Sequence, residues 1–163
     1  MSVPKPEIRR ARREDGPRIV ELDRELARFE KLRPSDDEEA RRLLAWIFES
    51  GKLEALVAEL DGRVEAMALF YETPGGTFRA RPFLYLEDLV VSEAARSRGV
   101  GEELMAALAR EAVSRKAIRL EWSVLDWNEG AIRFYRRLGA THHAEWIKYG
   151  LDADALEKLA ASD

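Results

Sequence analysis

The sequence has no cysteine, only two histidines and no long apolar run. The absence of cysteine excludes disulfides, thiolate metal sites and a cysteine nucleophile. No segment approaches the roughly 20 apolar residues of a membrane span, and residues 1–7 lack the apolar stretch of a signal peptide. The net charge of −4, from 27 basic and 31 acidic side chains, argues against a general nucleic-acid-binding surface. We therefore expect a cytoplasmic protein without a nucleic-acid or membrane partner.

The residues that are present suit one globular domain. Of 163 residues, 46% are hydrophobic and 36% are charged. A chain of this length buries about 70% of its unfolded surface, so it needs neither disulfide nor metal to hold a core. Because no internal repeat or low-complexity segment divides it, we expect a single domain over residues 1–163.

The spacing of apolar residues predicts a mixed α/β fold. Apolar residues three and four apart predict helices at about 13–30, 36–51, 101–115 and 128–139, and a last helix that Asp152 or Asp154 caps and that contains Leu156 and Leu159. Alternating or continuous apolar residues predict strands at 8–11, 55–60, 64–71, 83–91 and 118–124, and a strand or two in 142–151. Asp61-Gly62 is typical of a tight hairpin turn, and residues 73–77 are expected to form a loop.

Two helical faces are expected to be buried. In the first helix the apolar face consists of Ile19, Leu22, Leu26 and Phe29. In the helix at 101–115 it consists of Leu104, Met105, Leu108, Ala112 and Val113. Both sets follow the helical period, which indicates packing against a core.

The most informative segment is Arg96–Gly101, which links the predicted buried strand 83–91 to a helix start. Its two glycines allow backbone N–H groups to approach an anion, and the helix dipole adds attraction. Such a turn can cradle a pyrophosphate. No Gly-Lys-Ser/Thr follows, and the third glycine of the dinucleotide fingerprint is missing, so nucleoside triphosphates and NAD are disfavoured. A glycine-rich helix entry without a ligand is the alternative.

These residues resemble the GNAT superfamily of N-acetyltransferases, whose acyl-coenzyme A signature is the loop pattern Arg96–Gly101. The similarity extends to spermidine/spermine (diamine) and thialysine N-acetyltransferases. It is carried by the segments 25–30, 86–91, 126–129, 134–140 and 145–146. The resemblance implies a mostly antiparallel central sheet with flanking helices, acetyl-coenzyme A as co-substrate, no metal and a homodimer.

The same resemblance implies a place for coenzyme A between the strands at 83–91 and 118–124. The strand backbone would pair with the pantetheine arm, and the turn would hold the pyrophosphate. The implied cofactor-binding residues are Leu89, Val90, Val91, Arg96, Ser97, Arg98, Gly99, Val100, Gly101, Glu102, Asn128, Ala131 and Tyr135.

Acyl transfer to an amine requires a base, because an alkylamine has a pKa near 10 and arrives protonated. Glu87 is the candidate, since desolvation on a buried strand is expected to raise its pKa, and the proton leaves directly or through water. Asp88 points to the opposite face and is expected to be structural or secondary.

Tyr135 is the candidate acid for the departing thiolate, and it lies two helical turns after Asn128. A salt-bridged Glu87 and a core-packed Tyr135 are the alternatives.

A cationic acceptor favours carboxylates and aromatic faces in its pocket. By resemblance, the acceptor-binding residues are Phe29, Glu30, Glu87, Glu121, Ser123, Trp127, Glu145 and Trp146. The predicted function is acetylation of a primary amine of a polyamine, thialysine or lysine-like molecule by direct attack in a ternary complex. Two alternatives stay open: another acceptor, such as an aminoglycoside or a peptide amine, and a non-catalytic acyl-coenzyme A-binding regulatory module.

Two other site classes are disfavoured. No Gly-x-Ser-x-Gly occurs, which argues against a serine hydrolase. His142 and His143 are adjacent, so on a strand they point to opposite faces, and no third ligand is spaced to join them. We expect surface histidines. Segments 73–82 and 141–144 differ from the polyamine enzymes, which leaves the acceptor open.

Overall fold

The computed structural model describes residues 5–74 and 80–161. The chain divides into two compact units, Met1–Trp127 and Asn128–Asp163. The first contains β1 (Glu7–Arg10), η1 (Arg13–Asp15), α1 (Gly16–Phe29), α2 (Asp37–Phe48), β2 (Glu54–Leu60), β3 (Arg63–Thr73), β4 (Phe83–Val91), η2 (Glu93–Ala95), α3 (Val100–Ser114) and β5 (Leu120–Glu121). The second contains α4 (Glu129–Arg137) and α5 (Ala153–Ala160).

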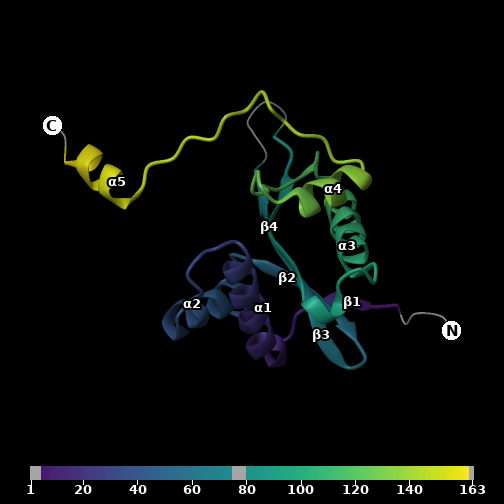
Figure 1. The fold of residues 1–163 in the computed structure, drawn as a ribbon. Helices are drawn as coiled ribbons and strands as arrows, with labels where there is room; N and C mark the ends of the chain where they lie inside the picture. Colours follow the sequence, from purple (N-terminus) through teal and green to yellow (C-terminus); the bar gives the residue numbers. More distant parts are fainter. Residues whose placement is uncertain (1–4, 75–79, 162–163) are drawn as a thin grey trace. The chain divides into compact units, whose positions relative to one another are not determined.

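The sheet has five strands in the order β1-β2-β3-β4-β5. The first three pairings are antiparallel and the pairing of β4 with β5 is parallel, which confirms a mixed, mostly antiparallel sheet (Figure 1). The turn between β2 and β3 has Asp61 and Gly62 at φ of +52° and +79°. Both residues are therefore in the left-handed region, as the favoured two-residue hairpin turns require.

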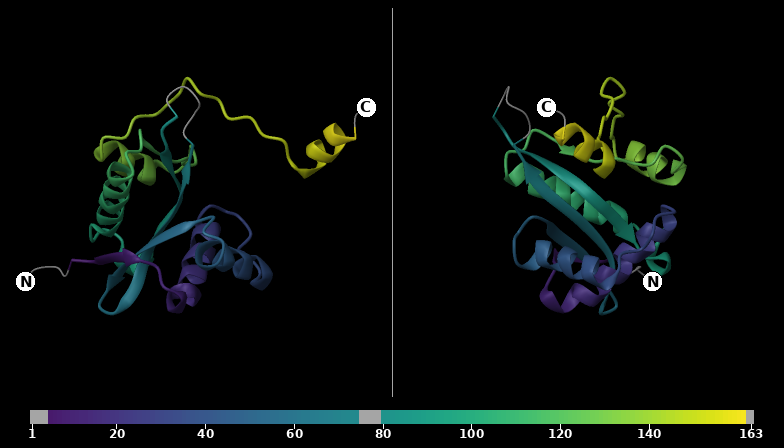
Figure 2. Two further views of the ribbon diagram at one scale, coloured as in Figure 1. Left: turned by 180° about the vertical axis from the view of Figure 1, so that it is seen from behind. Right: turned by 90° about the vertical axis from the view of Figure 1, so that its left-hand side faces the viewer.

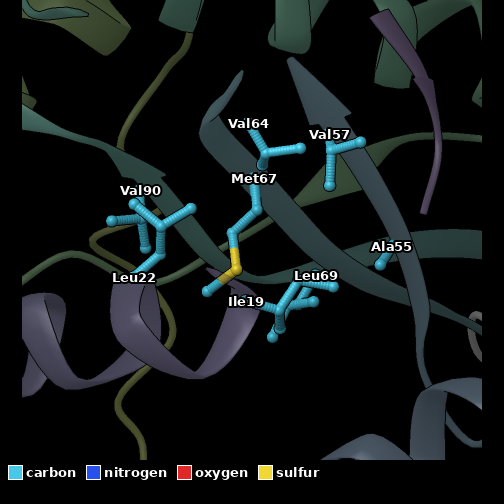
Figure 3. Close-up of a cluster of buried hydrophobic side chains, with 8 residues drawn as sticks. All are labelled: Ile19, Leu22, Ala55, Val57, Val64, Met67, Leu69 and Val90. Carbon is cyan, nitrogen blue, oxygen red and sulfur yellow. The ribbon is translucent and has the colours of Figure 1, made fainter. Parts of the chain in front are cut away.

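Helices cover both faces of this sheet, with α1 and α2 on one side and α3 on the other (Figure 2). The core under α1 consists of Ile19, Leu22, Ala55, Val57, Val64, Met67, Leu69 and Val90 (Figure 3). Leu26 and the apolar residues of α2 pack against it. On α3, Leu104 and Leu108 are fully buried. These burials confirm most of both predicted apolar faces.

The prediction of burial is wrong for two residues of these apolar faces. Phe29 is 47% exposed and Val113 is 78% exposed. Phe29 is the last residue of α1, and Val113 lies in the final turn of α3. The helical period specifies the direction of a side chain, but burial also needs an element that packs opposite that turn.

A β-bulge interrupts the pairing of β3 with β4. Leu69 pairs with Asp88 and Phe70 pairs with Leu86, so Glu87 has no partner position on β3. Directly opposed residues share a face of the sheet. Asp88 therefore shares the face of Leu69, which belongs to the core under α1. A bulge of this kind re-aims neighbouring side chains.

Two expected strands differ from the structure. The strand predicted at 118–124 is shortened to Leu120–Glu121, and the segment 142–151 forms no strand. Every residue from 141 to 150 is exposed. An alternating sequence forms a strand only where a neighbouring strand satisfies its backbone groups, so the alternation in 142–151 does not by itself produce one. Of the expected loop 73–77, Thr73 ends β3 and residues 75–77 lie outside the described residues.

The second unit has the helix ends that the sequence predicts. The Asn128 side chain accepts a hydrogen bond from the Ala131 N–H at 3.2 Å, and Gly139 follows α4 at φ +89°. The Asp152 carboxylate caps α5 through the Ala155 N–H at 2.9 Å. None of the described helices has the length and apolar character needed to cross a membrane.

Candidate active site

The turn after β4 exposes backbone N–H groups at a helix start. Ser97 and Gly99 adopt φ of +60° and +78°. Gly99 is also the N-cap of α3, and no side chain caps that helix. Within the described residues, no N-cap side chain accepts from the first-turn N–H groups of α3, which makes this helix end suited to an anion. A Cβ on Gly99 would meet nothing within 4 Å, so the backbone conformation, and not crowding, favours glycine there.

Two arginines flank this turn. The Arg96 Nε donates to the carbonyl oxygen of Val91 at 3.3 Å. Arg98 lies 4.0 Å from the Asp61 carboxylate, at the limit of an ion pair. Both arginines belong to the turn that leads into α3, so the turn carries positive charge in its sequence. This backbone geometry suits an anion, and the anion-binding role of Arg96–Gly101 stays a prediction.

Strand β4 lies between β3 and β5 only in its first part. β5 pairs with it only at Leu84 and Tyr85, among the residues that the structure describes. From Leu86 to Val91 the pairing of β4 is with β3. One edge of the segment Leu89–Val91 is thus without a strand partner in the described chain. An unpaired strand edge can pair with an extended amide-containing ligand.

The acidic group most affected by folding is Asp88. Burial raises the pKa of its carboxyl to about 7, and the nearby charges of Glu87, Asp23 and Glu30 raise it further. Burial also raises the pKa of Glu30. Three carboxylates, from α1, its C-cap and β4, thus lie within electrostatic reach of Asp88. A cation would stabilise this cluster.

The expected desolvation of Glu87 is wrong: its side chain is exposed, whereas Asp88 is partly buried. The bulge is the physical reason, because it removes Glu87 from the regular alternation and turns Asp88 toward α1. Asp23 was not predicted at all. The available signal was its spacing, because Asp23 and Glu30 are seven residues apart and share a face of α1.

An aromatic pair borders the end of α1. The rings of Phe29 and Trp127 are 5.8 Å apart. The Lys31 ammonium lies 4.7 Å from the Trp127 ring centroid. Trp127 therefore accepts a cation on its face in this structure. Glu30 follows Phe29 directly, so the structure brings the acceptor-binding residues predicted in α1 together with Trp127.

The remaining predicted residues of the first unit are Glu121, which ends β5, and Ser123, which lies two residues later. The hydroxyl groups of Ser123 and Tyr85 are hydrogen-bonded at 2.9 Å. Glu121 forms an ion pair with Arg119 at 2.5 Å. Ser123 is thereby attached to β4 two residues before Glu87. Glu121 is neutralised by Arg119, which weakens its attraction for an acceptor cation.

The second unit holds the other predicted residues. Tyr135 is partly buried on α4, and its ring lies 5.2 Å from that of Phe134. Glu145 contacts His143 at 3.3 Å, and its pKa is lowered by its own backbone N–H and by that histidine. Trp146 is 81% exposed.

Both histidines are exposed, as predicted. Within the described residues, no three histidine or acidic side chains gather to hold a metal ion.

Comparison with known proteins agrees with this geometry. The profile of a family described as the acetyltransferase (GNAT) family matches residues 17–140. A thialysine N-epsilon-acetyltransferase of Mus musculus is 32% identical, with 94% of this chain and 96% of that enzyme covered. An L-ornithine N5-acetyltransferase of Arabidopsis thaliana is 40% identical over 83 residues, which span 51% of this chain and only 36% of that enzyme. The solved structure of an integron cassette protein of V. cholerae has a TM-score of 0.84 and 26% identity, and the match covers 98% of this chain and 100% of that one.

Proposed function

Because the chain belongs to the GNAT acetyltransferase family and is an N-acetyltransferase, we propose that it transfers the acetyl group of acetyl-coenzyme A to a primary amine of a small cationic acceptor. The acceptor class is a lysine-like or ornithine-like amine, thialysine or a polyamine. Relatives named for thialysine and ornithine acetylation support this class.

The observation that carries the proposal is the carboxylate cluster around Asp88. It lies on the strand that precedes the anion-binding turn, and its member Glu30 adjoins Phe29 and its partner Trp127. Carboxylates and aromatic faces together favour a cationic acceptor over a neutral or anionic one.

The carboxylates also supply the proton acceptor that the reaction needs. A general base works best when its pKa lies near the working pH, and the pKa of Asp88 is about 7. We assign proton removal to the pair Glu87 and Asp88, directly or through water. The neutral amine then attacks the thioester carbonyl in a ternary complex, so that a C–N bond forms and the C–S bond breaks. Tyr135 protonates the departing thiolate, and its phenolate regains the proton that the attacking nitrogen loses as the amide forms.

The chain's own residues suit the co-substrate. The turn from Arg96 to Glu102 offers guanidinium groups and uncapped N–H groups to the pyrophosphate. The edge of Leu89–Val91 offers backbone pairing to the pantetheine amides. Asn128, Ala131 and Tyr135 of α4 are assigned to the thiol end. The two units together form one N-acetyltransferase domain in this proposal.

The proposed assembly is a homodimer. In the second unit, large apolar side chains remain exposed, namely Trp146, Ile147, Tyr149, Leu151, Leu156 and Leu159. Exposed apolar side chains that follow one another along a segment indicate an interaction surface. A second copy of the chain is the occupant that we assign to this surface.

The test is the release of coenzyme A thiol from acetyl-coenzyme A in the presence of thialysine, ornithine, lysine, spermidine, spermine, putrescine, an aminoglycoside and a peptide amine. The chain has no cysteine, so a thiol reagent reports only the product. We expect turnover with at least one of the small cationic amines. Double-reciprocal plots of initial rate for the two substrates are expected to intersect, as a ternary complex requires. Turnover with the peptide amine alone, or binding of acetyl-coenzyme A without turnover on any amine, would overturn the proposed acceptor class.

A further inference from the structure

A buried polar cluster lies beneath the start of the anion-binding turn. Its centre is Glu65 of β3, whose carboxylate accepts a hydrogen bond from the Ser92 hydroxyl at 2.5 Å. The same oxygen accepts a second bond from Arg18 at 3.1 Å. In the described residues, the buried polar and charged residues are Asp15, Glu65 and Ser92. Two of these three therefore belong to this cluster.

Arg18 ties the cluster to helix α1. Its Nε donates to the carbonyl oxygen of Val64 at 2.9 Å. Its Nη1 donates to Glu21 at 2.8 Å and reaches Glu25 at 3.5 Å. Burial opposes ionisation of Glu65, but the bonds from Ser92 and Arg18 lower its pKa overall. Glu65 is therefore a charged acceptor, and hydrogen bonds to a charged acceptor are stronger than neutral ones.

Ser92 connects Glu65 to the segment that leads into the turn. Its backbone N–H donates to the carbonyl oxygen of Glu65 at 2.8 Å, so Glu65 contacts both its backbone and its side chain. Ser92 is the N-cap of η2, yet its hydroxyl makes no cap hydrogen bond. Serine at this position usually caps the helix. Here the hydroxyl bonds to Glu65 in β3, and η2 leads directly into Arg96.

A solvent-open cavity of about 470 Å³ adjoins this cluster. Arg18, Glu65 and Ser92 line it, and Arg96 lines it too. The cluster and Arg96, the first residue of the anion-binding turn, therefore line the same cavity. A shift of Ser92 would displace Arg96 and the uncapped N–H groups that follow it.

We propose that Glu65, held by Arg18, is a positioning residue that acts through Ser92 to fix the anion-binding turn and thereby sets the affinity for acetyl-coenzyme A. The inference rests on the proposed function. Preorganised donors bind an anion more tightly because less conformational freedom is lost on binding. Neither Glu65 nor Ser92 is assigned to the reacting atoms, so the maximal rate does not depend on them directly.

The experiment measures the Kd of coenzyme A by calorimetry, together with KM for acetyl-coenzyme A and kcat. Ser92→Ala and Glu65→Gln are expected to raise Kd and KM about tenfold, the effect of losing one charge-assisted hydrogen bond. kcat is expected to change less than about twofold. Ser92→Thr keeps the hydroxyl and is expected to restore wild-type affinity.

Asp15→Asn is the matched control. Asp15 is also buried, and Arg9 binds its carboxylate at 2.7 and 2.9 Å, but its side-chain hydrogen bonds are to Arg9 and to the Arg12 N–H and not to the turn. It is expected to lower the melting temperature while Kd for coenzyme A stays unchanged. If Ser92→Ala and Glu65→Gln also lower only the melting temperature, the cluster is structural and the inference is wrong. If the wild-type chain does not bind coenzyme A, the proposed function and the inference both fail.

Discussion

Asp88 is partly buried beside three other carboxylates, so folding favours its protonated form. Its pKa rises from an ordinary value of 3.8 to about 7. A carboxyl with a raised pKa contributes most to stability below about pH 4, and that contribution is lost as the pH rises through 7. The carboxyl proposed to accept the amine proton therefore lowers stability once the pH exceeds about 7.

Asp88→Asn is expected to increase the free energy of unfolding by about 2 kcal/mol at pH 8, because no buried charge then forms. The decline in stability between about pH 4 and 7 is expected to flatten. Urea denaturation at pH 5 and pH 8 measures both effects. Asp154→Asn serves as control, since Asp154 is exposed and is not one of the charges that raise the pKa of Asp88. A variant as pH-dependent as the wild type would show that Asp88 is ionised in the folded chain throughout this range.

Tyr135→Phe tests the second catalytic assignment. The variant keeps the ring that packs near Phe134 but loses the phenol. We expect kcat to fall about a hundredfold with Kd for coenzyme A unchanged, the size of a general-acid contribution. Tyr149→Phe, at a tyrosine that is 94% exposed, is the control and should have wild-type activity. Nearly full turnover in Tyr135→Phe would exclude Tyr135 as the acid.

At the scale of elements, the turn before α3 combines two left-handed residues with a helix start that no side chain caps. A left-handed residue at Ser97 is costly for a side chain, which is typical of sites where a backbone must present its N–H groups. The strained turn, the uncapped helix and the free edge of β4 lie consecutively along the chain.

Gly99→Ala and Gly62→Ala form a matched pair for this turn. The two glycines have φ of +78° and +79°, and an added Cβ would meet nothing within 4 Å at either. Each substitution is expected to lower the free energy of unfolding by about 1 kcal/mol. Only Gly99→Ala is expected to raise KM for acetyl-coenzyme A, by about tenfold or more. Equal KM values in the two variants would contradict the assignment of the pyrophosphate to this turn.

At the scale of the whole molecule, the exposed apolar side chains of the second unit predict self-association. Size-exclusion chromatography with light scattering is expected to give twice the chain mass. Replacing both Trp146 and Ile147 by serine should produce a monomer of unchanged helix content. A monomeric wild-type chain at micromolar concentration would exclude the homodimer.

The sequence by itself determined the features that local interactions control. The helices α1 to α5 follow from apolar spacing and from caps such as Asn128 and Asp152. The hairpin at Asp61-Gly62 and the turn at Arg96–Gly101 follow from the backbone freedom of glycine and its neighbours. Because these signals act within a few residues, they are visible without knowledge of the fold.

Only the tertiary structure decided the features that depend on a distant partner. The bulge that separates the roles of Glu87 and Asp88 arises from the pairing of β4 with β3. The short length of β5 depends on its pairing with β4 at Leu84 and Tyr85. The bond of Glu65 to Ser92 joins residues 27 positions apart. Strand pairing and burial are set by long-range packing, so neither the position of the raised pKa nor the cluster beneath the turn could be read from local sequence.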